Sequence, residues 1–205
     1  MPDMIKIQFK QKCKKNFGDG PDPFTAKEYI LMTDTKLRKL VLAALFAALT
    51  CLMTMVIRVP SPMGGYVNLG DCAVLLSAWV LGPVYGGAAA GVGSMLADLL
   101  GYPLYAPGTL VIKGLMAVAA ALIFRALRPD SSLSLPALTV SGVTAEIIMV
   151  GGYFLYEALD LPLFMGFGMA AAANIPFNMV QGVFGLVAAG AVYVVLDRSH
   201  ARARI

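Results

Sequence analysis

Two opposite charges stand in an otherwise apolar stretch of the sequence, GSMLADLLGYPLYAPGTLVIKGL, residues 93–115. A short segment rich in Gly, Pro and Tyr separates Asp98 from Lys113. A charge within lipid is costly, so it usually faces the protein interior or a watery cavity and pairs with an opposite charge. We therefore expect Asp98 and Lys113 to lie at similar depth, either as a structural ion pair or as part of a site for a polar ligand.

Further polar side chains occur in the apolar segments of the chain. Asn174, Asn178 and Gln181 have the i, i+4, i+7 spacing that places side chains on one face of a helix. Asn68 precedes one apolar run, and Glu146 lies near the middle of another. Aromatic candidates stand near the ends of the runs: Tyr102, Tyr105 and Tyr153. Amide and charged groups can fix a small polar ligand while aromatic rings stack on it, so these residues predict a ligand pocket.

Each of these residues also fits a purely structural role. Tyrosine is frequent at membrane interfaces without binding anything. Asn174 and Asp71 both have the type and position of helix N-caps. The sequence leaves these alternatives open, but the convergence of many polar groups at one depth favours a pocket.

The elements that would position these residues are transmembrane helices. Of the 205 residues, 59% are hydrophobic and 14% are charged, whereas soluble domains have about 25% charged residues. A helix rises about 1.5 Å per residue, so a run of roughly 20 apolar residues spans the bilayer. Apolar runs of suitable length occur at 40–57, 72–97, 109–124, 136–156 and 175–196, and only Lys113 and Glu146 are charged within them.

Positive charge indicates how the run at 72–97 folds, because Gly82-Pro83 interrupts it. Lys and Arg mark cytoplasmic loops, and here they gather in the N-terminal segment, at 125–128 and in the C-terminal tail. These three regions share one side of the membrane only if Gly82-Pro83 is a turn between two short helices. We therefore predict an all-α membrane protein of six transmembrane helices with both termini cytoplasmic.

The predicted organisation has three parts: a weakly ordered cytoplasmic leader (1–36), a six-helix membrane domain (37–198) and a basic cytoplasmic tail (199–205). The net charge of +4 comes mainly from the chain ends, which favours contact with the lipid bilayer over binding of nucleic acid. One histidine and three cysteines without metal-ligand spacing predict no metal centre. We expect no cofactor.

Residues 37–196 resemble the substrate-binding S components of energy-coupling factor (ECF) vitamin transporters, in the branch labelled riboflavin-type or hydroxymethylpyrimidine-type. One feature is a pair of overlapping AxxxA patterns, which give a helix a flat face for close packing in its own bundle or on a partner. These alanines are Ala43, Ala44, Ala47 and Ala48. The other features are YVNLGDCAVLLSAWVLGPVYGGAAAGVGSMLADLLGYPLYAPGTLVIKG at 66–114 and NIPFNMVQG at 174–182.

The resemblance implies capture of a vitamin or vitamin precursor at the outer face of a prokaryotic plasma membrane, in a multi-pass protein. VPSPMGGYVN (59–68) would act as the lid. It also implies partners, namely a membrane T component, on which the alanine face docks, and two ATP-binding subunits. The sequence has no GxxxxGK[ST] motif, so ATP hydrolysis is expected in those partners and not in this chain.

An amide-rich, aromatic-lined site suits a heterocycle, and we rank hydroxymethylpyrimidine or pyridoxine first and riboflavin second. A free Lys113 would also admit the carboxylate of pantothenate. Two other classes of protein remain as alternatives. A membrane enzyme could pair Asp98 with Glu146, although the sequence contains neither HExxH nor GxSxG. A ligand-free scaffold subunit would explain the small-residue helices but not the polar residues.

Overall fold

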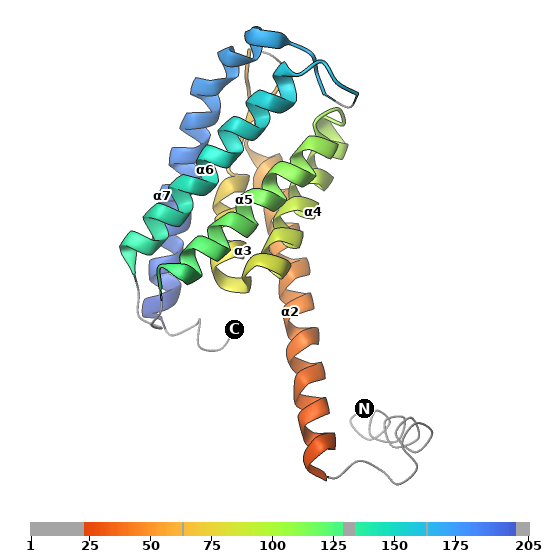
Figure 1. Ribbon diagram of the computed structural model, residues 1–205, viewed down its shortest axis with the longest axis vertical. Coiled ribbons are helices and arrows are strands. Elements are labelled where there is room, and N and C mark those ends of the chain that lie inside the picture. The colour runs from red at the N-terminus through yellow and green to blue at the C-terminus, as the bar shows by residue number, and fades with distance from the viewer. Residues whose placement is uncertain (1–22, 63, 129–133, 163, 200–205) are drawn as a thin grey trace. The chain divides into compact units, whose positions relative to one another are not determined.

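The computed structural model describes residues 23–62, 64–128, 134–162 and 164–199, with the backbone alone for 23–35 (Figure 1). The chain divides into two compact units, Met1–Leu40 and Val41–Ile205. The described part of the first unit is helical and belongs to α2 (Pro23–Val56). The weakly ordered leader over 1–36 stays a prediction: residues 23–36 are helical, and residues 1–22 lie outside the described residues.

The second unit is mainly helical. The end of α2 leads into a short antiparallel hairpin of β1 (Val59–Pro60) and β2 (Tyr66–Val67), in which Val59 lies opposite Val67. The helices that follow are α3 (Gly70–Leu81), α4 (Pro83–Gly101), α5 (Ala106–Ala126), α6 (Leu135–Ala158), the 3-10 helix η1 (Gly168–Asn174) and α7 (Ile175–Arg198).

Among the described residues, four helical segments are long and apolar enough to cross a membrane: Lys36–Val56, Ala106–Ala126, Leu135–Ala158 and Gly168–Arg198. The chain is thus a multi-pass membrane protein by length and composition of its helices. α3 has 12 residues, or about 18 Å, against a hydrocarbon core of about 30 Å. The predicted turn between two helices at Gly82-Pro83 is confirmed, whereas the count of six spans stays a prediction.

Gly82 makes the turn between α3 and α4. Its φ of +83° lies in the region that favours glycine, and Pro83 follows in the first turn of α4. A Cβ on Gly82 would meet the guanidinium group of Arg125, at the end of α5. The turn and the basic end of α5 therefore share one end of the bundle, as the predicted topology requires.

Aromatic side chains close the core at this end. The Trp79 ring meets the Tyr193 ring edge-on at 5.6 Å between centroids, and Phe124 meets Tyr193 in the same way at 5.5 Å. The Trp79 indole N–H donates to the Ser141 hydroxyl at 3.0 Å, and Arg128 donates to the Tyr193 hydroxyl at 2.7 Å. Because α3, α5, α6 and α7 all contribute, this packing fixes the helices that carry polar residues at the opposite end.

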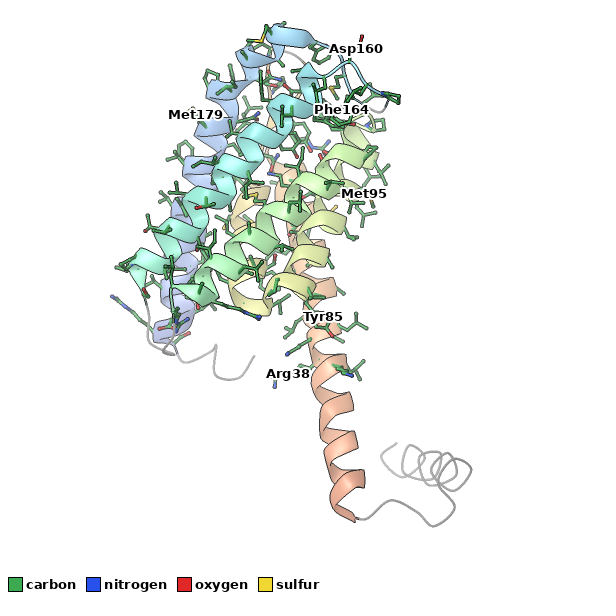
Figure 2. All side chains as sticks on the ribbon, viewed as in Figure 1. Arg38, Tyr85, Met95, Asp160, Phe164 and Met179 are labelled. Atoms are coloured by element: carbon green, nitrogen blue, oxygen red, sulfur yellow. The ribbon has the colours of Figure 1, made fainter. Side chains whose placement is uncertain are left out.

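The outer surfaces of the helices are apolar. Met179 on α7 is 57% exposed and points away from the neighbouring helices (Figure 2). Leu122 on α5 and Ile147 on α6 are exposed in the same way. In a bilayer such side chains face the lipid, which agrees with the predicted membrane location.

Replacement of Gly93 by Ala should destabilise the bundle, because its Cβ would lie 2.4 Å from the Ala47 carbonyl oxygen. Relieving such overpacking typically costs about 1–3 kcal/mol. The matched control is Gly190→Ala, whose Cβ would meet no atom within 4 Å. Thermal unfolding in detergent should show a lower Tm for Gly93→Ala and an unchanged or higher Tm for Gly190→Ala. Equal behaviour of the two variants would show that α2 and α4 are not in close contact.

Candidate ligand-binding site

Buried polar side chains line a narrow pocket. The α4–α5 connection and η1, which lie at one end of the bundle (Figure 1), are next to it. The structure brings seven of the predicted site residues together in this lining: Asn68, Asp98, Tyr105, Lys113, Tyr153, Asn178 and Gln181. Tyr102, Glu146 and Asn174 do not line it. The pocket draws its walls from α2, the hairpin, α4, α5, α6 and α7, so it depends on the whole bundle.

A buried ion pair lies at the floor of the pocket, but its partners differ from those expected. Lys113 pairs with Asp71 and not with Asp98. The second Asp71 oxygen accepts from the Gln181 amide at 2.7 Å, and the Gln181 oxygen accepts from the Asn68 backbone N–H at 2.8 Å. Asp71 is not an N-cap, since Leu69 holds that position and Asp71 lies in the first turn of α3. The pair therefore joins α3, α5, α7 and the hairpin.

Asp98 does not pair with Lys113 but accepts a hydrogen bond from the predicted lid. The Tyr66 hydroxyl, on β2, donates to Asp98 Oδ1. Burial, and after it the Asp98 carboxylate, raise the pKa of the Tyr66 phenol far above its ordinary value, so Tyr66 stays protonated and donates. Tyr102 stacks on the Tyr66 ring at 4.5 Å, and the Arg58 guanidinium lies 5.0 Å from the same ring centre. Tyr102, predicted to touch the ligand, thus supports the lid residue.

Glu157 is the second carboxylate of the lining. It accepts hydrogen bonds from the Tyr105 hydroxyl at 3.1 Å and from the Asn174 amide at 2.8 Å. Burial, and then the Glu157 carboxylate, raise the pKa of the Tyr105 phenol well above its ordinary value. Asn174 occupies the N-cap position of α7, but its side chain makes no capping bond and orients Glu157 from behind the lining.

Three further polar side chains are buried without a hydrogen-bond partner among the described residues: Thr54, Ser94 and Glu146. Thr54 and Ser94 are 3% and 1% exposed and line the pocket. Glu146 is 8% exposed, and one of its oxygens would lie 2.9 Å from a Cβ on Gly182 of α7. Buried polar groups are nearly always hydrogen-bonded in folded proteins, so unpartnered hydroxyls that face a pocket indicate positions for ligand atoms.

The pocket is small in this conformation. Its volume of about 20 Å³ suits a single water molecule and not a heterocycle. Ser61, Gly65 and Tyr66 of the hairpin are among the lining residues, so outward movement of residues 59–68 would enlarge it. This geometry agrees with the predicted role of that segment as a lid.

A larger hollow of about 530 Å³ lies on the other side of Asn68 and Gln181, which line both cavities. Its remaining lining is apolar and comes from the hairpin region and α7, with Val59, Phe177 and Phe184 among the side chains. Such a surface offers little to orient a polar ligand. The narrow polar pocket is therefore the candidate for the ligand site.

The two predicted alanine patterns separate in the structure. Ala43 is buried against Leu81 and Ala89, and the Ala47 carbonyl lies against Gly93 of α4. The other stripe, Ala44 and Ala48, is exposed. Packing within the bundle therefore accounts for Ala43 and Ala47 without a partner protein.

Several residues of the pocket are not among the predicted site residues: Thr54, Ser61, Tyr66, Ser94, Thr109 and Glu157. A lone hydroxyl in an apolar helix gives no signal, because Ser and Thr often bond only their own backbone. Tyr66 lies in the predicted lid and Glu157 near the outer end of the run at 136–156, and their polar, hydrogen-bonding side chains could have identified both. Thr109 follows from helix spacing, since it stands one turn before Lys113.

A helical membrane bundle with a small, polar, lidded pocket defines a membrane protein that binds a small molecule. A family model described as "ECF-type riboflavin transporter, S component" matches residues 34–198. A protein of Pyrococcus woesei, described as an uncharacterized protein in gap 3'region, is 35% identical over 146 residues, which are 71% of this chain and 92% of that protein. The chain belongs to the S-component family, whose members are substrate-binding components of transporters and not enzymes.

The fold has a counterpart among solved structures. It is similar to the chain described in "Structure and mechanism of the S component of a bacterial ECF transporter", with a TM-score of 0.56 and 20% sequence identity. The match covers 81% of this chain and 96% of that one. The helical bundle described above is therefore the S-component fold.

Lys113→Met should strongly destabilise the protein, because it leaves the Asp71 carboxylate buried without its partner. Breaking a buried pair in this way typically costs about 3–5 kcal/mol. The double variant Asp71→Asn/Lys113→Met should recover part of that loss, whereas Asp98→Asn/Lys113→Met should not. The comparison requires Tm values of the single and double variants in detergent. If only the double variant Asp98→Asn/Lys113→Met recovered stability, Lys113 would pair with Asp98, as expected from the sequence.

Proposed function

We propose that this chain captures a small heterocyclic vitamin or vitamin precursor at the extracellular side of the cell membrane and delivers it inward. Hydroxymethylpyrimidine or pyridoxine is the first candidate and riboflavin is the second. The observation that carries the proposal is the convergence of buried carboxylate, amide and unpartnered hydroxyl groups in one pocket beneath the hairpin. Such a pocket can hold a ligand whose ring carries several hydrogen-bonding groups.

The orientation follows from the basic residues. Arg125 lies at the Gly82 turn, and Arg128 lies within 3.7 Å of Asp197 near the end of α7. Positive charge favours the cytoplasmic side, so this end faces the cytoplasm and the pocket faces outward. Six membrane-crossing or membrane-embedded helices, α2 to α7, then leave both termini in the cytoplasm.

The ligand ranking rests on the size and polarity of the pocket. A single pyrimidine or pyridine ring requires a smaller displacement of residues 59–68 than the three fused rings of riboflavin. The description of the matching family names riboflavin, which keeps that vitamin as the second candidate. The Lys113 ammonium group already binds Asp71, so it is not available for the carboxylate of pantothenate.

The partners are a membrane T component and two ATP-binding subunits, which supply the energy for delivery. The exposed alanines of α2, Ala44 and Ala48, form the docking face for the T component. Small side chains let another helix approach closely in lipid, where van der Waals packing contributes much of the association energy. Ala43 and Ala47 lie on the face of α2 that packs against α4.

Mass spectrometry of small molecules released from protein purified in mild detergent should detect the ligand. Asn178→Ala should then weaken binding of that ligand by about tenfold, as expected for the loss of one buried hydrogen bond. The matched control is Met179→Ala, which changes the neighbouring residue on the outer face of α7. If Asn178→Ala binds as tightly as Met179→Ala, Asn178 does not contact the ligand. If no vitamin is released and none binds when added, the proposed function is wrong.

Ala48→Trp should abolish copurification of the T component and uptake into cells, while ligand binding by the isolated chain persists. A large ring on this face prevents close helix approach. Leu122→Trp, on the exposed face of α5, is the control for adding a tryptophan to a lipid-facing surface. The docking face lies elsewhere if the Ala48→Trp complex still assembles.

A further inference from the structure

The lining of the pocket contains two buried carboxylates, Asp98 and Glu157. Asp98 and Glu157 are each 2% exposed, and neither forms a salt bridge among the described residues. Neutral groups donate hydrogen bonds to both carboxylates: the Tyr66 and Thr109 hydroxyls to Asp98, and the Tyr105 hydroxyl and the Asn174 amide to Glu157. Neutral donors lower the cost of burying a carboxylate but leave its charge uncompensated.

The positive groups near the pocket do not balance these carboxylates. Lys113 is matched by Asp71, with which it pairs. Arg58 lies behind the Tyr66 and Tyr102 rings, outside the lining, and donates to the backbone oxygens of Thr54 and Ala97. Arg58 can offset one further negative charge at most. When Asp98 and Glu157 are both ionised, the described residues of the site therefore hold an excess of negative charge.

Glu146 lies outside the lining. Both of its oxygens are buried without a hydrogen-bond partner among the described residues. Thr54 and Ser94 present unpartnered hydroxyl oxygens to the pocket itself. A hydroxyl oxygen can accept a hydrogen bond from an N–H group. The pocket therefore offers carboxylate and hydroxyl oxygens to a ligand that is rich in N–H donors.

We propose that the ligand binds as a cation, through an amine or a protonated ring nitrogen that Asp98 and Glu157 neutralise. This inference rests on the proposed function and narrows its substrate class to heterocyclic bases. A cationic ligand supplies the charge that the described residues lack, whereas a carboxylate or phosphate would be repelled by Asp98 and Glu157 at low dielectric. Pyrimidine and pyridine vitamins carry basic nitrogen atoms and fit this class.

A vitamin panel bound to the purified full chain tests the charge class. The basic compounds are hydroxymethylpyrimidine, pyridoxine, pyridoxamine and thiamine; riboflavin is the neutral compound; pantothenate and biotin are the anionic compounds. A basic compound should bind tightest. If riboflavin or an anionic compound binds tightest, the charge inference is overturned while the proposed function stands. If no compound binds, the proposed function fails and this inference fails with it.

Two compounds with the same ring isolate the effect of charge. Pyridoxamine carries an amine at the position where 4-pyridoxate carries a carboxylate. The dissociation constant of 4-pyridoxate divided by that of pyridoxamine therefore measures the preference for a cation. Glu157→Gln and Asp98→Asn should each reduce that ratio by about tenfold or more, because each removes one negative charge from the lining. The control is Asp160→Asn, an exposed carboxylate at the same end of the bundle (Figure 2).

The two lining variants serve as independent tests, since Glu157→Gln could disturb the Tyr105 and Asn174 bonds, whereas Asp98→Asn affects the Tyr66 bond. A Tm in detergent identifies a variant that has lost its fold. A ratio that stays at the parent value in a folded Asp98→Asn or Glu157→Gln variant would overturn the inference.

Discussion

The buried pair of Asp71 and Lys113 determines how the rest of the site is arranged. Removing two ions from water is costly, and the cost is recovered only when the remaining polar atoms are also satisfied. Here the Gln181 amide donates a hydrogen bond to the second Asp71 oxygen, and the Asn68 backbone N–H donates to the Gln181 oxygen. Because these groups come from α3, α5, α7 and the segment before α3, the pair can form only when all of them are in place. It also neutralises Lys113, which lines the pocket.

Close packing of helices provides the geometry that the pair requires. Helices in lipid gain little from hydrophobic burial against one another, so small residues at their contacts matter more than in water. A Cβ on Gly185 would lie 2.6 Å from Asp71 Cβ, and one on Gly93 would lie 2.4 Å from the Ala47 carbonyl. These contacts bring α7 to α3 and α4 to α2. The glycines therefore help to position the charged groups, because they allow the helices that carry those groups to pack closely.

The sequence predicted the helices and the pocket face of α7 better than the pairing of charges. Apolar runs locate helices because periodicity and length are local, and Gly82-Pro83 marks a turn for the same reason. The pairing of Asp98 with Lys113 failed because the true partner, Asp71, lies 42 residues away along the chain and reaches Lys113 through tertiary packing. For Asn174 the sequence left a cap and a ligand contact open; it occupies the N-cap position of α7, but its side chain bonds Glu157. The buried hydroxyls of Thr54 and Ser94 carry no local signal at all.

The carboxylates of the lining also couple charge to the lid. Tyr66 reaches Asp98 from the hairpin, and a hydrogen bond to an ionised acceptor is worth about 1.5–3 kcal/mol, against about 1 kcal/mol for a neutral one. Protonation of Asp98 would weaken the contact that holds residues 59–68 over the pocket. A cation inside the pocket keeps Asp98 ionised, so the Tyr66 contact stays strong. A basic ligand would thus stabilise the closed lid through the same carboxylate that recognises it, whereas an anionic ligand would favour protonation of Asp98 and loosen the lid.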